Sequence, residues 1–311
     1  MIKEILKQWC PRKIYKMYAD TKYWIRFKFY PQGLASEMFR GILGYELNWD
    51  NPQDINEKIN WLKFNSDTSE WTRLADKYLV RDYVKERIGE HVLPKIYGVW
   101  ENAGEIDFDE LPNQFVLKTN HGCGTVLPVL NKSTLDIVTT RLQLNKWINS
   151  VFGYETVEPH YMKISPLIYA EQLLENDVDF SSGLVDYKVF CLSGEPYGVL
   201  VCTDRVLGKH TNLSFYNCNW QFMPDVVAGK HSGESIEIPR PACLDLLLEY
   251  ARKLAYGHPQ VRVDFYIVHG NIYFGEMTFT SQGGYMDYIS KDYSLQMGQL
   301  IKLPSKCHTH Q

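Results

Sequence analysis

The segment 261–280 constrains the fold of this chain more than any other. Two runs rich in β-branched and aromatic residues flank His269, Gly270 and Asn271, a pattern that predicts an antiparallel β-hairpin. With these three residues as the loop, Val268 faces Ile272. A two-residue loop would shift the register by one residue and turn the side chains of one strand to the other face. The length of the turn therefore decides which side chains meet.

The three-residue loop brings two carboxylates together. Counting back from it pairs Asp264 with Glu276, and Arg262 with Thr278, on one face of the hairpin. Opposed like charges in an otherwise apolar hairpin repel each other unless a cation or a proton joins them. Oxygen ligands suit Mg²⁺, which takes one or two carboxylates together with substrate phosphates and water. We therefore predict a Mg²⁺ and phosphate site here; the alternative is a solvent-facing acid pair neutralised by Arg262 alone.

A second phosphate-binding pattern lies at residues 114–125. A predicted strand ends at Lys118, and a loop with His121, Gly122 and Gly124 follows it. Glycines let backbone N–H groups approach an anion, and the lysine supplies a positive charge. The segment is not a P-loop, however, and a plain turn would contain the same glycines.

The strand predicted at 167–174 leads into a polar stretch that resembles a nucleotide hinge. Backbone groups at 172–174 could bind an adenine base while Glu175 or Asp177 takes the ribose hydroxyls, although a plain sheet strand would have the same composition. The next predicted hairpin begins at Asp186 and Lys188, ends at Asp204 and Arg205, and adds further charge of the phosphate-binding kind.

The remaining pattern predicts an α+β protein, with both helices and many short strands. Asp54 and Glu57 have the spacing of a capping box at the start of the first helix. Helices are expected at 52–64, 71–88, 133–149 and 240–256, and strands at 92–100, 114–119, 126–130, 167–174, 185–192, 197–203 and 213–216.

Length and charge narrow the class of protein. A chain of 311 residues with 45% hydrophobic residues can form one large domain or two joined ones. The net charge of −4 offers no field to attract nucleic acid. The seven cysteines are scattered, and neither a signal peptide nor a membrane-length apolar run is present, so we expect a cytoplasmic protein.

Residues 1–30 differ from the rest of the chain. They contain eight Lys or Arg against two Asp or Glu, which leaves a net charge of −10 on the remainder, and they contain eight aromatic residues. This mixture can lie at a membrane surface or on an anionic glycan. The alternative is a basic helix docked on the acidic body.

Six segments in this order identify a family: INEKINWLK (55–63), ADKYLVRDYV (75–84), FVLKTNHGCG (115–124), DYKVFCLSGEP (186–196), VRVDFY (261–266) and YFGEMTF (273–279). Together they resemble the ATP-grasp superfamily, specifically the TupA-like ATP-grasp group found with bacterial surface-polysaccharide genes. The resemblance covers about residues 51–302.

The resemblance implies an α+β ATP-grasp fold, in which two α+β subdomains grip ATP and a basic, aromatic helical segment precedes them at the N-terminus. That segment is expected at 1–50 and an N-terminal α/β subdomain at 51–113. A lid subdomain with the glycine loop is expected at 114–174, and a C-terminal subdomain with the metal-binding hairpin at 175–311.

The resemblance also implies a role for each candidate residue. Arg262 would stabilise the transferred phosphoryl group, and Lys188 would face the same cavity. Thr278 stands where many ATP-grasp enzymes have Asn, and its hydroxyl can still bind the metal ion or its water. The implied ATP contacts are Lys77, Lys118, His121, Gly122, Gly124 and Thr125, with Glu171, Gln172, Leu173 and Leu174 as the adenine hinge; the implied Mg²⁺ ligands are Asp264, Glu276 and Thr278.

The implied reaction is ligation: ATP phosphorylates a carboxylate, and an amine attacks the acyl phosphate to give an amide, ADP and phosphate. The polysaccharide association indicates a uronic-acid carboxylate joined to an amino acid or another amine. One alternative is a metal-dependent glycosyltransferase that uses Asp177-Val-Asp179 as a D-x-D motif, and another is a nucleotide-binding scaffold without turnover.

Overall fold

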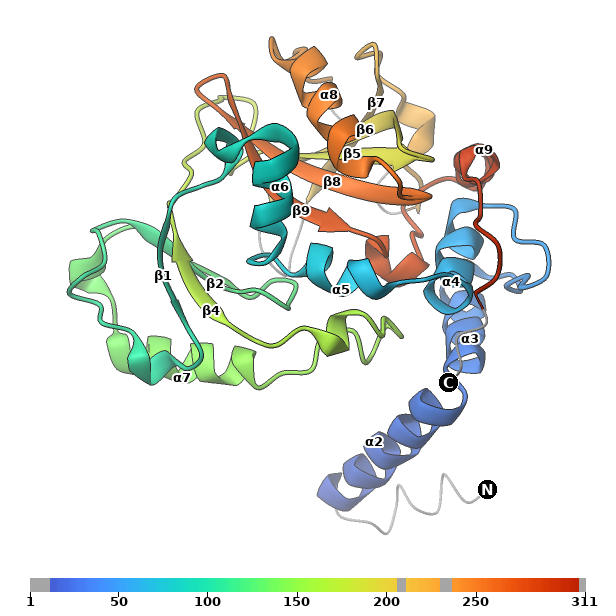
Figure 1. The fold of residues 1–311 in the computed structure, drawn as a ribbon, viewed down its shortest axis with the longest axis horizontal. Helices are drawn as coiled ribbons and strands as arrows, with labels where there is room; N and C mark the ends of the chain where they lie inside the picture. The colour runs from blue at the N-terminus through green and yellow to red at the C-terminus, as the bar shows by residue number, and fades with distance from the viewer. Residues whose placement is uncertain (1–11, 206–210, 230–236, 308–311) are drawn as a thin grey trace.

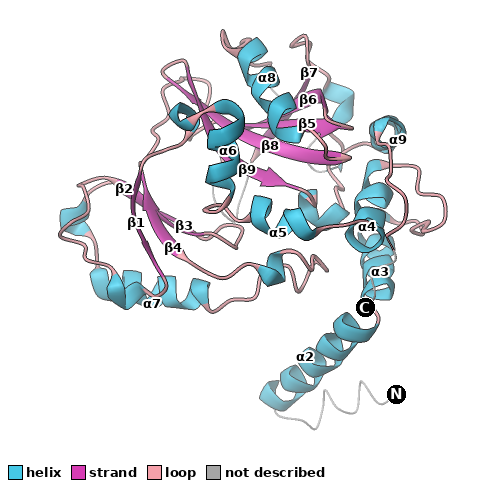
Figure 2. Ribbon diagram, viewed as in Figure 1, coloured by secondary structure: helices cyan, strands magenta, loops and turns pink. Residues whose placement is uncertain are grey.

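The computed structural model describes residues 12–205, 211–229 and 237–307, which form two antiparallel sheets surrounded by helices (Figures 1 and 2). The helices are α2 (Arg12–Phe29), α3 (Pro31–Leu43), α4 (Ile55–Asn65), α5 (Ser69–Ala75), α6 (Val80–Ile88), α7 (Ile137–Ile148), α8 (Leu244–Ala255) and α9 (Lys291–Leu300). The strands are β1 (Ile96–Trp100), β2 (Phe115–Thr119), β3 (Val126–Val129), β4 (Ile168–Glu171), β5 (Asp186–Leu192), β6 (Glu195–Thr203), β7 (Asn212–Asn217), β8 (Gln260–Val268) and β9 (Asn271–Thr278).

The strands form a four-stranded sheet in the order β1-β4-β2-β3 and a five-stranded sheet in the order β7-β6-β5-β8-β9. Every strand pair is antiparallel. This arrangement confirms the predicted α+β class and each predicted strand, with shifts of a few residues at the ends.

Each sheet has its own apolar core. Leu144 of α7 packs with Phe115 and Ile168 of the four-stranded sheet. One face of the five-stranded sheet packs on α4, α5, α6 and α8, and its opposite face packs on α4 and α9. On that second face, Lys188 of β5 pairs with Asp264 of β8, so the face changes from apolar to charged along these two strands.

The structure confirms the predicted capping box and corrects the helix expected at 71–88. Asp54 accepts the backbone N–H of Glu57, and the Glu57 side chain accepts the backbone N–H of Asp54. The single helix at 71–88 is wrong: Asp76 is extended and separates α5 from α6. Its carboxylate accepts the backbone N–H groups of two following residues at 2.8 and 3.0 Å, and also the Asn120 amide at 2.7 Å. Helical periodicity does not reveal this tertiary contact.

The predicted turn of the 261–280 hairpin is also wrong, although the predicted carboxylate pair is right. Val268 pairs with Asn271, so the loop has two residues, and both His269 (φ 50°) and Gly270 (φ 75°) have positive φ. A β-bulge then inserts Gly275 into β9, and the register beyond it pairs Asp264 with Glu276. The one-residue error in the loop and the one-residue bulge compensate.

Among the described residues, no helix has both the length and the apolar character needed to cross a membrane.

Candidate functional site

Arg262 joins the two carboxylates of the hairpin. Its guanidinium donates to both oxygens of Asp264, with Nε–Oδ1 at 2.7 Å and Nη2–Oδ2 at 2.8 Å. The same Nη2 lies 3.1 Å from Glu276 Oε1 and 3.1 Å from the Thr278 hydroxyl. The cation that opposed carboxylates require is therefore a side chain of this protein.

Lys188 reaches Asp264 from the neighbouring strand β5. Its ammonium pairs with Asp264 and lies 2.6 Å from Asp186 Oδ2, which also accepts Arg205 Nη1 at 3.1 Å. Asp186 Oδ1 is buried and has no hydrogen-bond partner among the described residues. Cations and carboxylates thus alternate across β5, β8 and β9.

Lys77 reaches the same cluster from the break between α5 and α6. Its Nζ lies 3.2 Å from Glu276 Oε2 and donates to the Gly122 carbonyl at 2.9 Å. The interruption of the helix therefore positions one lysine against both the hairpin and the glycine loop.

The alternation of charge sets the pKa values of the cluster. Burial raises the pKa of Asp264, and Arg262 and Lys188 offset part of that shift. Burial also disfavours ionisation of Glu276, but Lys77 and Arg262 outweigh it and lower the pKa of Glu276. For Lys188, burial favours the neutral amine, yet the neighbouring carboxylates raise its pKa. Glu276 and Lys188 are consequently charged at neutral pH.

The oxygens of Asp264, Glu276 and Thr278 form a donor set that fits Mg²⁺ by its chemistry. The same oxygens pair with Arg262, Lys188 and Lys77, so the ion would bind in exchange for some of these contacts. Across the described part of the chain, no group of three or more His, Cys, Asp or Glu side chains is arranged to hold a metal. The magnesium site stays a prediction.

A cavity of about 250 Å³ adjoins the charged cluster and is lined by both sheets. Lys118 and Glu171 form an ion pair in its wall, and Asp186 and Arg205 belong to both the cavity and the cluster. The lining residues are Val116, Lys118, Gly124, Val126, Pro128, Glu171, Gln172, Leu173, Leu174, Leu184, Asp186, Arg205 and Tyr266. Mostly apolar walls with a few charged groups are typical of a small-molecule site.

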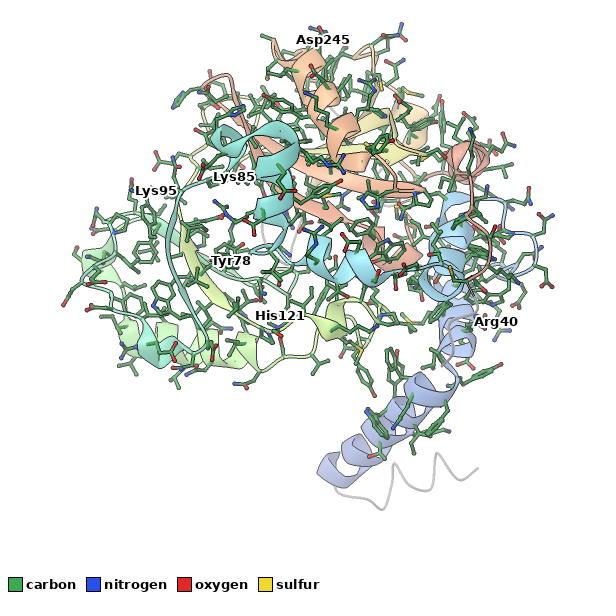
Figure 3. The ribbon with its side chains drawn as sticks, viewed as in Figure 1. Arg40, Tyr78, Lys85, Lys95, His121 and Asp245 are labelled. Carbon is green, nitrogen blue, oxygen red and sulfur yellow. The ribbon has the colours of Figure 1, made fainter. Side chains whose placement is uncertain are left out.

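Two other predicted loop residues, His121 and Thr125, do not line this cavity. His121, labelled in Figure 3, is buried, and its Nε2 lies 3.1 Å from the Ser150 carbonyl. Burial lowers the pKa of His121. Thr125 accepts a hydrogen bond from the Thr119 hydroxyl at 2.8 Å, and this contact closes the loop. In this conformation His121 and Thr125 support the glycine loop, whereas Gly124 lines the cavity.

The sequence prediction assigned no role to several cavity residues. Val116 and Tyr266 each lie two residues from a predicted site residue on the same strand. Because side chains alternate along a strand, this spacing is the signal that could have found them. Asp186 and Arg205, by contrast, are predicted from the sequence to add charge of the phosphate-binding kind, and both line the cavity.

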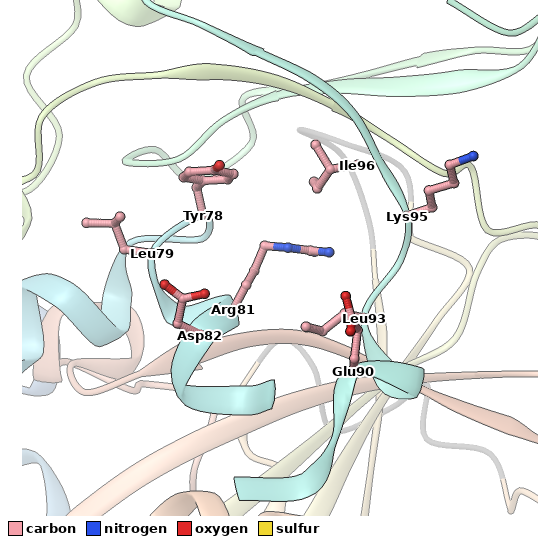
Figure 4. Close-up of a pocket in the computed structure, with 8 residues that line it drawn as sticks. All are labelled: Tyr78, Leu79, Arg81, Asp82, Glu90, Leu93, Lys95 and Ile96. Atoms are coloured by element: carbon pink, nitrogen blue, oxygen red, sulfur yellow. The ribbon is translucent and has the colours of Figure 1, made fainter. Parts of the chain in front are cut away.

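A larger polar cavity of about 510 Å³ lies between α6 and the start of β1 (Figure 4). Tyr78, Arg81 and Lys95 are among its lining residues, and Arg81 donates to the Pro94 carbonyl at 2.7 Å. None of the predicted site residues lines this cavity.

The D-x-D motif has a structural explanation. Asp177 Oδ2 accepts the backbone N–H of His269 at 2.5 Å, so this carboxylate holds the turn between β8 and β9. That contact requires no metal ion.

The chain belongs to the TupA-like ATP-grasp family, whose model matches residues 57–302, and this confirms the resemblance found in the sequence. It is similar to a D-alanine–D-alanine ligase from Bacillus anthracis complexed with ATP (12% identity, TM-score 0.41, covering 79% of this chain and 75% of that one). It is also similar to a D-alanine–D-alanine ligase from Helicobacter pylori (12% identity, TM-score 0.45, covering 82% and 68%). No curated protein matches the chain.

Proposed function

We propose that this protein is an ATP-dependent carboxylate–amine ligase that forms an amide through an acyl phosphate. The observation that carries the proposal is the continuity of the cavity with the charged cluster through Asp186 and Arg205. An adenine base in the cavity, beside the hinge at 171–174, would direct the phosphates of ATP toward the cations on β2 and β5. Membership of an ATP-grasp family supports this orientation.

The residues of the cluster provide mainly electrostatic catalysis. A carboxylate oxygen of the substrate attacks the γ-phosphorus, ADP leaves, and the acyl phosphate forms. The amine then attacks the carbonyl carbon, phosphate leaves, and the amine loses its proton. Lys188 and Arg262 are fixed before the reaction and neutralise charge on the transferred phosphoryl group. When Mg²⁺ is bound by Asp264, Glu276 and Thr278, it supplies further positive charge to the phosphates.

The substrates we propose are a uronic-acid carboxylate, in a sugar or glycan, and an amino acid or another amine. This part of the proposal is supported by the likeness to a family found with bacterial surface-polysaccharide genes. We accordingly propose that the reaction belongs to capsule or surface-polysaccharide synthesis on the cytoplasmic side of the membrane.

The test is incubation of the full chain with ATP, Mg²⁺ and pools of amino acids and uronic-acid sugars, scored by ADP release and by the mass of a new amide. We expect ADP and amide in equal amounts. If calorimetry detects binding of UDP-sugars but not of ATP, the glycosyltransferase alternative replaces this proposal. ATP binding without ADP release in any pool would indicate a scaffold.

A further inference from the structure

The C-terminal part of α2 has an inner face that packs on the protein. Tyr23 and Phe27, one helical turn apart, place their ring centroids 4.9 and 5.2 Å from that of Tyr154. Arg26 on this side forms an ion pair with Glu37. The inner face therefore holds α2 in place as the arm seen in Figure 1.

The opposite face of α2 is exposed and strongly aromatic. Trp24, Ile25 and Phe29 are 50%, 47% and 73% exposed. The Lys28 ammonium lies 5.2 Å from the centroid of the Trp24 ring and 5.7 Å from that of Phe29. These side chains share one side of the helix because residues four apart lie one above the other. We call Lys22, Trp24, Ile25, Lys28 and Phe29 the outer face of α2.

An apolar groove of about 460 Å³ continues from the outer face. Trp24 belongs to both the outer face and the groove. Val151, Tyr154 and Met162, from the segment 151–162, line most of the rest of the groove. The exposed fraction of Val151 is 64%. The groove extends the apolar surface away from the helix, and none of its described lining residues is acidic.

We propose that the outer face of α2 binds the surface of an anionic lipid bilayer. Residues 1–30 have a net charge of +6 and the remaining chain −10, so an anionic surface attracts this segment and repels the rest. The lysines would lie among the head groups, and Trp24, Ile25 and Phe29 would enter the boundary with the acyl chains. A soluble polyanion would match the lysines but would leave the apolar groove without a complement.

The proposal is independent of the ligase activity and is tested by co-sedimentation of the full chain with vesicles. We expect binding to phosphatidylcholine vesicles that contain phosphatidylglycerol, weak binding to phosphatidylcholine alone, and a loss of binding as salt rises. The double variant Trp24→Ser/Phe29→Ser should lower the partition coefficient more than about tenfold, and Lys22→Glu/Lys28→Glu should lower it by a similar factor.

The matched control is Val138→Ser/Leu142→Ser, which removes two exposed apolar side chains from α7 instead. This control should bind as the wild type does, and all variants should retain the wild-type thermal unfolding midpoint. Equal binding by the wild type and both α2 variants would overturn the proposal. Equal loss of binding in the α7 control, or binding to an acidic polysaccharide but not to vesicles, would also overturn it.

Discussion

The charged residues of the two sheets have different surroundings. In the five-stranded sheet, Asp264 is buried between Arg262 and Lys188, and each of these cations touches a second carboxylate. In the four-stranded sheet, Lys118 and Glu171 form one pair in the wall of a mostly apolar cavity. A dense network is expensive to bury and is rigid, whereas an isolated pair can exchange its partner for a ligand. We therefore propose that the five-stranded sheet carries the chemistry and that the four-stranded sheet binds the nucleotide.

The largest effect is expected for Asp264→Asn, which keeps the side-chain volume but removes the charge shared by Arg262 and Lys188. Turnover should fall by about a thousandfold because the phosphoryl-transfer site loses its alignment and a predicted metal ligand. Steady-state ADP release measures this loss. The control is Glu195→Gln on β6, whose carboxylate forms an exposed surface pair with Arg252 and should retain full turnover. Near-normal turnover of the Asp264 variant would show that the charged network of the five-stranded sheet does not carry the chemistry.

The stability of the Asp264→Asn variant tests whether Arg262 and Lys188 depend on the Asp264 carboxylate. From the sequence alone, opposed carboxylates predict relief of repulsion on neutralisation. In the structure Arg262 bridges the pair, so neutralising Asp264 leaves buried cations with fewer partners. We now expect a destabilisation of about 3 kcal/mol. Denaturant unfolding measures it, and an increase in the free energy of unfolding would show that repulsion dominates.

A smaller effect on turnover is expected for Lys188→Ala. Its loss should lower kcat by about a hundredfold and leave the KM for ATP within a few-fold, because the charge acts mainly on the transferred group. The measurement is an ATP titration at saturating co-substrate. A change confined to KM would instead assign Lys188 to nucleotide binding.

Lys118→Ala should show the reverse pattern. Removing a charged partner at the cavity should raise the KM for ATP by about tenfold or more, with the smaller change in kcat. Lys146→Ala on α7 is the control, since that lysine is exposed and outside the cavity. Identical kinetics for all three proteins would show that Lys118 does not face the nucleotide.

The last prediction concerns the stability, not the kinetics, and a buried group outside both networks. Both ring nitrogens of His160 lack a partner among the described residues, and burial lowers its pKa to about 3. Between the ordinary pKa near 6.5 and this value, only the unfolded chain takes up the proton. His160 therefore reduces stability as pH falls below about 6.5, by about 2 kcal/mol at pH 5, and has no such effect above it. His160→Phe should reduce the loss of unfolding free energy between about pH 6.5 and about pH 5, as measured by denaturant unfolding. An unchanged loss in this variant would show that the carboxylates cause it.

Local sequence pattern predicted the strands, because alternation and turn residues act over a few positions. It failed where distant segments decide. Asp76 interrupts a periodic helix through its bond to Asn120, and the bulge at Gly275 restores a register that the turn length alone would have lost. The burial of His121 depends on its contact with the Ser150 carbonyl, 29 residues away, which no local spacing encodes.

The central claim, that this site activates a carboxylate with ATP, can be tested before the natural amine is known. Hydroxylamine attacks an acyl phosphate and leaves a stable hydroxamate together with phosphate. With hydroxylamine added to the protein, ATP, Mg²⁺ and a pool of uronic-acid sugars, we therefore expect hydroxamate and ADP in equal amounts, and Asp264→Asn should yield neither above background. ADP release without hydroxamate across the carboxylate pools would contradict the claim.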